Sequence, residues 1–138
     1  MKKISFLSLL FSAFFLVIIS CDQKPPKNSR VAQAMRGKAL FMEKCVQCHG
    51  EDGKGLKLDT LATQPADLTE IMWNRRVKEF PILEIANIID GRKMAEAHGT
   101  RAMPIWGEVF AKEEYLDEKE IKGKMAELIA YLMSIQGS

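Results

Sequence analysis

The sequence is short of several features, and each shortage excludes a class of protein. It has only three cysteines in 138 residues, which excludes a disulfide-rich fold. Its longest apolar run, from Ile4 to Ile19, is shorter than the ~20 residues that a membrane-spanning helix needs. Convincing alternation of apolar and polar residues over the length of a strand is also missing, so we do not expect a sheet.

An excess of charge of one sign is missing as well. The formal net charge is +2, and it comes from Lys2 and Lys3, because the first twenty residues contain no acid. The remaining residues carry 18 basic and 18 acidic side chains. The overall charge therefore gives no reason to expect binding to nucleic acid, and only local patches could steer a partner.

The first residues read as an export signal. Two lysines precede the apolar run, which is typical of a secretory signal peptide over residues 1–20. The run ends in Ile18-Ile19-Ser20-Cys21, which resembles the bacterial lipobox and implies a lipid on Cys21. Residues 21–30 contain two prolines and little that is apolar, so we expect a flexible tether. The folded domain is then expected over residues 31–138, exported and lipid-anchored on the periplasmic side of a bacterial membrane.

Helical periodicity dominates the rest of the chain and predicts an all-α fold. One apolar stripe runs into the first cysteine of the domain, and a second follows an N-cap pair of Asp117 and Glu120. A third helix is expected from Pro81 to Gly91, and a shorter one from Asp67 or Thr69 to about Val77. The stripe positions are Ala34, Gly37, Phe41 and Cys45 in the first helix, Ile82, Ile85 and Ile89 in the third, and Ile121, Met125, Leu128, Leu132 and Ile135 in the last.

Long loops are expected around residues 50–66 and 91–116, and structureless stretches of this length are uncommon in a compact domain. A large apolar cofactor would organise them. The run Cys45-Val46-Gln47-Cys48-His49 matches C-x-x-C-H, the attachment signature of c-type haem. Two thiols at this spacing add to the two haem vinyl groups, and the following imidazole coordinates the iron.

Three other interpretations of this motif are weaker. A thioredoxin-like redox pair needs a βαβ context, which is not visible here. A structural zinc site would use Cys45, Cys48, His49 and His98, but adjacent Cys and His ligands do not match the usual zinc spacing. A thiol pair without a role is improbable in an exported protein, where it would tend to oxidise.

The mature domain resembles a small class I c-type cytochrome over nearly its whole length. The resemblance is carried by GKALFMEKCVQCHGEDGKG, PADLT, IIDGRKMAEAHGTRAMPIWGEVF and LIAYLMSIQ. It implies the cytochrome c fold, in which the N- and C-terminal helices cross, with short helices and long loops around one covalent haem c. Gly37 and Phe41 should then meet Leu128 and Tyr131, because a glycine lets two helix backbones approach closely.

The resemblance also implies that Met103, which precedes Pro104, is the distal iron ligand, with His98 and an open iron as alternatives. Trp106 is either a buried anchor over the haem edge or a hydrogen-bond donor to a haem propionate. Basic side chains at Arg75, Arg76, Arg92 and Lys93 could neutralise the propionates, although solvated surface charges explain them better. The acidic residues between 113 and 120 could be a docking patch or simply the start of a helix.

The function expected from these residues is single-electron transfer between redox partners at a membrane surface. An iron with ligands on both faces leaves no position for a substrate, so the protein is not expected to be an enzyme. The alternative is a haem enzyme or gas sensor with an open or His-ligated distal site.

Overall fold

The computed structural model of the chain describes residues 24–92 and 103–137. The signal peptide, Cys21, Lys93, Met94 and His98 lie outside the described residues. Within them the regular structure is entirely helical, as the sequence predicted, and the helices follow in the order α2 (Arg30–Lys44), α3 (Val46–His49), α4 (Ile71–Asn74), α5 (Ile82–Asp90), α6 (Trp106–Lys112) and α7 (Glu118–Ser134). None of these helices is long and apolar enough to cross a membrane.

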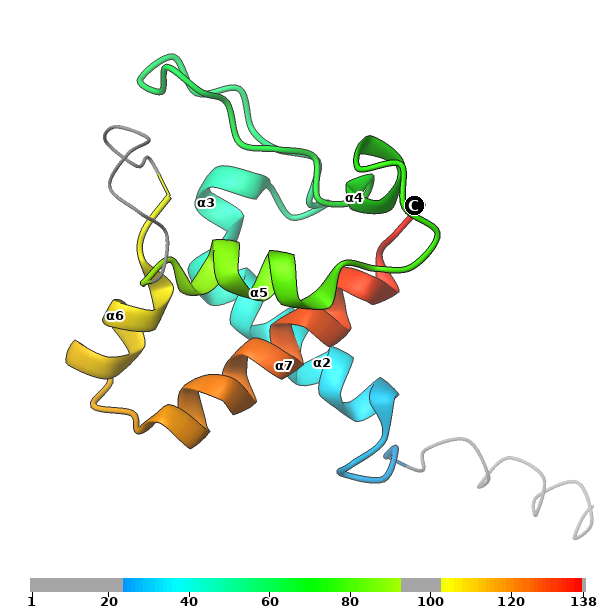
Figure 1. Cartoon of the computed structure of the whole chain (residues 1–138), viewed down its shortest axis with the longest axis vertical. Coiled ribbons are helices and arrows are strands. Elements are labelled where there is room, and N and C mark those ends of the chain that lie inside the picture. Colours follow the sequence, from blue (N-terminus) through cyan, green and yellow to red (C-terminus); the bar gives the residue numbers. More distant parts are fainter. Residues whose placement is uncertain (1–23, 93–102, 138) are drawn as a thin grey trace, which may run out of the picture.

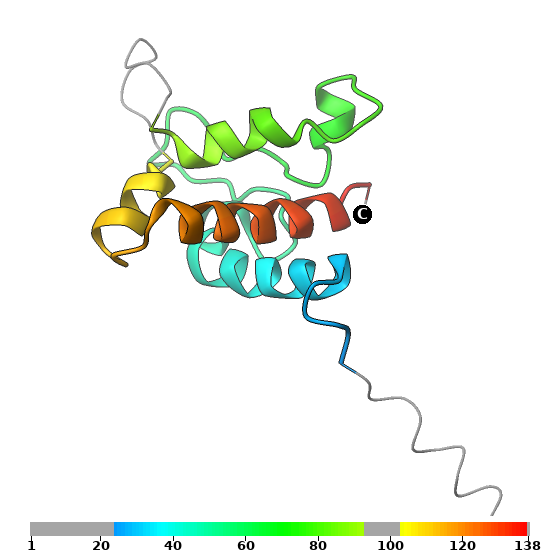
Figure 2. The same cartoon turned by 60° about the horizontal axis from the view of Figure 1, so that its bottom comes forward.

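The helices α2 and α7 cross and form the framework of the fold (Figures 1 and 2). Ser29 caps α2, accepting a hydrogen bond from the Ala32 amide at 3.1 Å. At the crossing, a Cβ atom on Gly37 would lie 1.9 Å from the Glu127 carbonyl oxygen, so only glycine fits. The rings of Phe41 and Tyr131 pack with centroids 5.2 Å apart. The predicted crossing is therefore confirmed.

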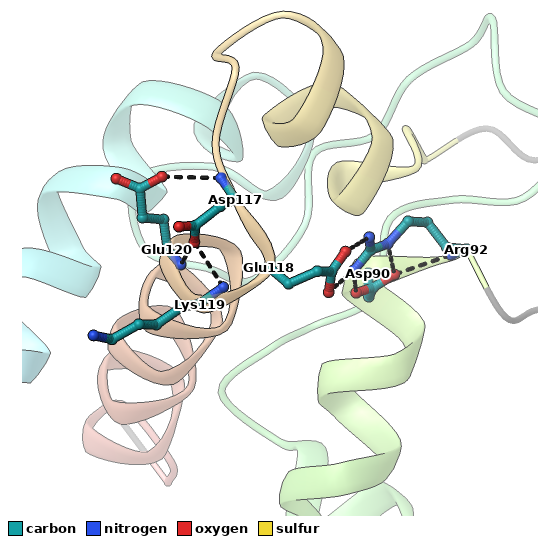
Figure 3. Close-up of polar contacts among 6 residues, drawn as sticks. All are labelled: Asp90, Arg92, Asp117, Glu118, Lys119 and Glu120. Atoms are coloured by element: carbon teal, nitrogen blue, oxygen red, sulfur yellow. Dashed lines mark hydrogen bonds and ion pairs between the residues drawn. The ribbon is translucent and has the colours of Figure 1, made fainter.

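The start of α7 is fixed by the predicted capping box. The Asp117 side chain accepts from the amides of Lys119 and Glu120, and the Glu120 side chain accepts from the Asp117 amide (Figure 3). The apolar stripe of α7 is buried as predicted, with Ile135 packed against the core, which consists of Leu40, Phe41, Ile71, Ile85, Ile89, Phe110, Ile121, Met125, Leu128, Ile129, Tyr131 and Leu132.

The helix α5 packs against α7 and ends where expected, at Gly91, which adopts a left-handed conformation with φ 72°. Ile85 and Ile89 are buried against the core, but Ile82 is about half exposed because it lies in the first turn of the helix. An ion-paired group joins the end of α5 to the start of α7: Arg92 binds Asp90 and Glu118 (Figure 3).

Two expectations from the sequence are wrong in detail. The stretch 91–116 is not all loop, because α6 forms within it and buries Phe110 and Gly107. The helix expected from Asp67 or Thr69 to Val77 is only the single turn α4. Asp67 turns its side chain onto the amide and hydroxyl of Thr69, at 2.8 and 2.7 Å, and so forms a turn before the helix instead of capping it.

Candidate functional site

Cys45 and Cys48 lie at the joint between α2 and α3. The Cys45 amide donates to the Phe41 carbonyl at 2.8 Å, so it closes α2, and the His49 amide donates to the Cys45 carbonyl at 3.0 Å, so Cys45 also opens α3. The two thiols are three residues apart on one helical turn, which places them on the same side of it. Both are free and half-buried. Burial raises the pKa of the Cys45 thiol to about 11, so it is protonated at neutral pH.

His49, the last residue of α3, is oriented by the backbone of the following loop. Its Nδ1 atom lies 3.1 Å from the Ala66 carbonyl oxygen. A carbonyl can only accept, so Nδ1 donates and the lone pair of the neutral ring lies on Nε2. Burial lowers the pKa of His49, which keeps the ring neutral near pH 7. A neutral imidazole with a free Nε2 and a bonded Nδ1 is the arrangement found in metal-ligating histidines.

The loop that carries Ala66 is folded back onto α3. The amides of Gly55 and Leu56 donate to the carbonyls of His49 and Cys48 at 2.9 and 2.8 Å. Gly55 has φ +87°, and a Cβ atom there would lie 2.4 Å from the Pro65 carbonyl oxygen. The glycine therefore brings the Pro65–Ala66 segment close to His49. No sequence pattern pointed to Ala66 as the partner of His49, although the PADLT segment contains it.

The segment that begins at Met103 and leads into α6 is the second part of the fold that was expected to face a haem. The segment from Met103 into α6 and the helix α3 lie at the same end of the fold (Figures 1 and 2). Cys45, Met103 and Trp106 are all partly buried against the same apolar core. Trp106 begins α6, and its ring packs on Phe110 with centroids 6.0 Å apart. This packing gives Trp106 a structural role and leaves its role towards a haem a prediction.

Two of the other charged candidates, Arg75 and Arg92, are engaged in ion pairs of the fold. Arg75 binds Glu84 at 2.8 Å, and Arg92 binds Asp90 and Glu118. In the acidic stretch, Glu114 binds Lys44 and Lys124 at 2.8 and 3.3 Å. Asp117 and Glu120 cap α7. Most of the acidic stretch therefore stabilises the start of α7.

The donors gathered at this end suit a covalently attached haem. They are two thiols on one helical turn and an oriented neutral imidazole. Within the described residues no group of three His, Cys, Asp or Glu side chains is placed to hold a metal ion by itself. The two thiols and the imidazole fit a group that would be attached covalently and would bring most donors of its iron with it.

Comparison with protein families gives a match that spans this part of the chain. The family model described as Cytochrome c matches residues 34–136, which is most of the chain and includes both cysteines, His49 and Met103. Comparisons with curated proteins and with solved structures found no match. Cytochromes c carry electrons on a covalently bound, iron-containing haem c. The chain has the all-α cytochrome c fold, binds haem c and belongs to the cytochrome c family.

Proposed function

We propose that this protein carries single electrons between redox proteins at a membrane surface, on one haem c held by Cys45 and Cys48 and ligated by His49 and Met103. The observation that carries this proposal is the hydrogen bond from His49 Nδ1 to the Ala66 carbonyl, since it presents Nε2 as a ligand. When bound, the haem supplies a reversible one-electron couple of its iron.

Each proposed site residue has a distinct task. Cys45 and Cys48 form the two thioether links, for which their half-buried thiols on one helical turn are suitably spaced. His49 would hold the iron through Nε2. Met103 would hold it through its thioether, which favours the reduced iron and raises the reduction potential. Trp106 and Phe110, packed together at the start of α6, help to keep water from this end of the core.

The proposed ligand pair is the reason to regard the protein as a carrier and not an enzyme. With an imidazole and a thioether both bound to the iron, the protein would offer no open position for a substrate or a gas. A haem enzyme or sensor would need Met103 displaced, or His98 in its place.

Attachment to the membrane is proposed from the sequence. A signal peptide over residues 1–20 and a lipid on Cys21 would place the domain on the periplasmic side of a bacterial membrane. The short tether before α2 would keep the domain close to the bilayer and raise its effective concentration near membrane-bound redox partners.

An absorption spectrum of the purified protein, oxidised and then reduced, tests the site. We expect sharp c-type bands that survive acid–acetone extraction, together with the weak near-infrared band of methionine–iron ligation. Covalent haem without that band, with strong carbon monoxide binding by the reduced protein, would favour the enzyme or sensor. A protein without haem after expression with a working attachment system would contradict the proposal.

A further inference from the structure

The exposed apolar side chains are distributed unevenly over the described residues. Nine large apolar side chains are exposed, and seven of them lie on the first turns of α2, on α4 and the residue Val77 after it, on the first turn of α5, or on the last turn of α7. These helix ends lie at one end of the molecule, whereas α3 and α6 lie at the other (Figures 1 and 2). We call this the tether end: Val31, Met35, Trp73, Val77, Ile82, Leu83 and Met133.

These side chains line or flank two hollows. Val31, Met35, Ile82 and Met133 line one groove of about 1130 Å³ between α2, α5 and α7. Leu83 is 79% exposed and shares a helical stripe with Asn87 and Asp90, which line the same groove. Trp73 and Val77 line a second hollow beside Gln136 and Gly137, just after α7. Large apolar side chains that are exposed and gathered at one end of a small domain mark an interaction site.

The charges around the tether end are mostly basic. Its acids Glu84 and Glu127 are paired with Arg75 and Arg36. Two acids at this end, Glu70 and Glu79, form no ion pair with another described residue. Five basic residues at this end likewise form none with the described part of the chain: Lys24, Lys27, Arg30, Arg76 and Lys78. Apolar side chains surrounded by basic ones, with a tryptophan 80% exposed among them, suit the interface of an anionic bilayer.

The segment that leads into the domain indicates that a bilayer lies next to the tether end. The segment from the proposed lipid on Cys21 to the cap at Ser29 spans eight residue steps and reaches at most about 27 Å. It enters the domain at Arg30, which itself lines the groove. The tether would therefore hold this end of the molecule, and not the opposite end, next to the bilayer.

We infer that the tether end docks directly on the surface of an anionic phospholipid bilayer, with Val31, Met35, Ile82, Leu83 and Trp73 at the lipid interface and Arg30 and Arg76 at the headgroups. This rests on the lipid anchor proposed above. Docking in this orientation leaves α3, with Cys45, Cys48 and His49, facing away from the membrane (Figure 1). The haem would then be presented to partners approaching from the aqueous side.

Vesicle binding by the haem-loaded mature chain carrying Cys21→Ser tests the surface without the lipid. We expect sedimentation with vesicles of phosphatidylglycerol and phosphatidylethanolamine at least about tenfold tighter than with phosphatidylcholine, weakening as salt is raised. Arg30→Gln should weaken binding about fivefold, and Leu83→Glu about tenfold or more, because it removes an apolar contact and adds a repelled charge.

Tyr115→Glu is the matched control. Tyr115 is 88% exposed and lies between α6 and α7, at the opposite end, so this variant should bind vesicles like the parent. An unchanged haem spectrum in each variant shows that it is folded. This assay does not depend on the iron ligands, so a wrong Met103 assignment would leave its result intact.

Two results would overturn the inference. One is a parent protein that does not bind anionic vesicles, or that loses binding equally with Leu83→Glu and Tyr115→Glu. The other is a dimer in sedimentation equilibrium without vesicles that Leu83→Glu abolishes, which would assign the surface to a second copy of the chain.

Discussion

The Nδ1 atom of His49 lies 3.1 Å from the carbonyl oxygen of Ala66, a residue on the far side of the glycine-rich loop. The contact links the attachment motif to a segment 17 residues further along the chain. It fixes which ring nitrogen carries the proton and how the ring is turned. With His49 as the proposed iron ligand, the loop would belong to the haem site, and its conformation should influence the iron.

Changing Gly55 should disturb this contact without touching any ligand. In Gly55→Ala the new Cβ would lie 2.4 Å from the Pro65 carbonyl oxygen, and φ is +87° there, so the Pro65–Ala66 segment must move. We expect a loss of about 1–3 kcal/mol in the free energy of unfolding. A redox titration should also show a higher reduction potential, because His49 loses the acceptor that makes it a more basic ligand.

Gly123→Ala is the control for this change. A Cβ atom on Gly123 meets nothing within 4 Å, so the variant should keep the parent potential and gain about 0.5–1 kcal/mol from its helical alanine. A destabilised Gly55→Ala protein with the parent potential would show that the Ala66 hydrogen bond does not tune the iron.

Replacing the proposed distal ligand should change the iron without releasing the haem. In Met103→Ala the two thioether links remain, so the haem should stay covalently attached through acid–acetone extraction. The near-infrared methionine band should disappear, and the reduction potential should fall because the thioether no longer favours reduced iron. Met133→Ala changes an exposed methionine on α7 and should leave both properties unchanged. A parent-like potential in Met103→Ala would remove Met103 from the site.

The crossing of α2 and α7 should tolerate no side chain at Gly37. A Cβ atom there would lie 1.9 Å from the Glu127 carbonyl oxygen and 2.9 Å from Tyr131 Cβ, so Gly37→Ala must push the two helices apart. We expect a loss of about 3 kcal/mol in denaturant unfolding, at the upper end for overpacking. Gly123→Ala, on α7 but away from the crossing, again serves as the control. Equal stability of the two variants would contradict the close approach seen here.

The ion pair of Lys44 and Glu114 should make stability depend on pH at both extremes. The hydrogen bond to Lys44 holds the pKa of Glu114 below its ordinary 4.5, so its contribution is complete above that value and is lost as pH falls through the lowered pKa. The hydrogen bond to Glu114 raises the pKa of Lys44 above 10.5. Its contribution is complete below 10.5 and is lost as pH rises through the raised pKa.

Glu114→Gln should therefore lower the free energy of unfolding at pH 7 by about 1 kcal/mol, since both partners are only partly exposed. The difference from the parent should shrink at low pH, where Glu114 is protonated in both states. Urea midpoints across the pH range measure this. Glu108→Gln breaks the more exposed pair with Lys112 and should cost no more than about 0.5 kcal/mol. A difference that persists unchanged in acid would argue against the ion pair.

Local information in the sequence was sufficient for the main helices and for the attachment motif. The periodicity of α2, α5 and α7, the capping box at Asp117 and the stop at Gly91 are set by neighbouring residues, and the structure shows all of them. The spacing of Cys45, Cys48 and His49 is equally local, because thioether attachment and ligation need residues on one turn.

Contacts between distant segments decided the rest. The seven-residue α6 was expected as loop, because its burial depends on packing against the core and not on its own periodicity. Periodicity likewise placed Ile82 on the apolar face of its helix. It could not show that this face extends past the packed core, which leaves Ile82 about half exposed. The Ala66 carbonyl could not be predicted, since every residue has such an oxygen and only the closure of the loop around Gly55 brings this one to His49.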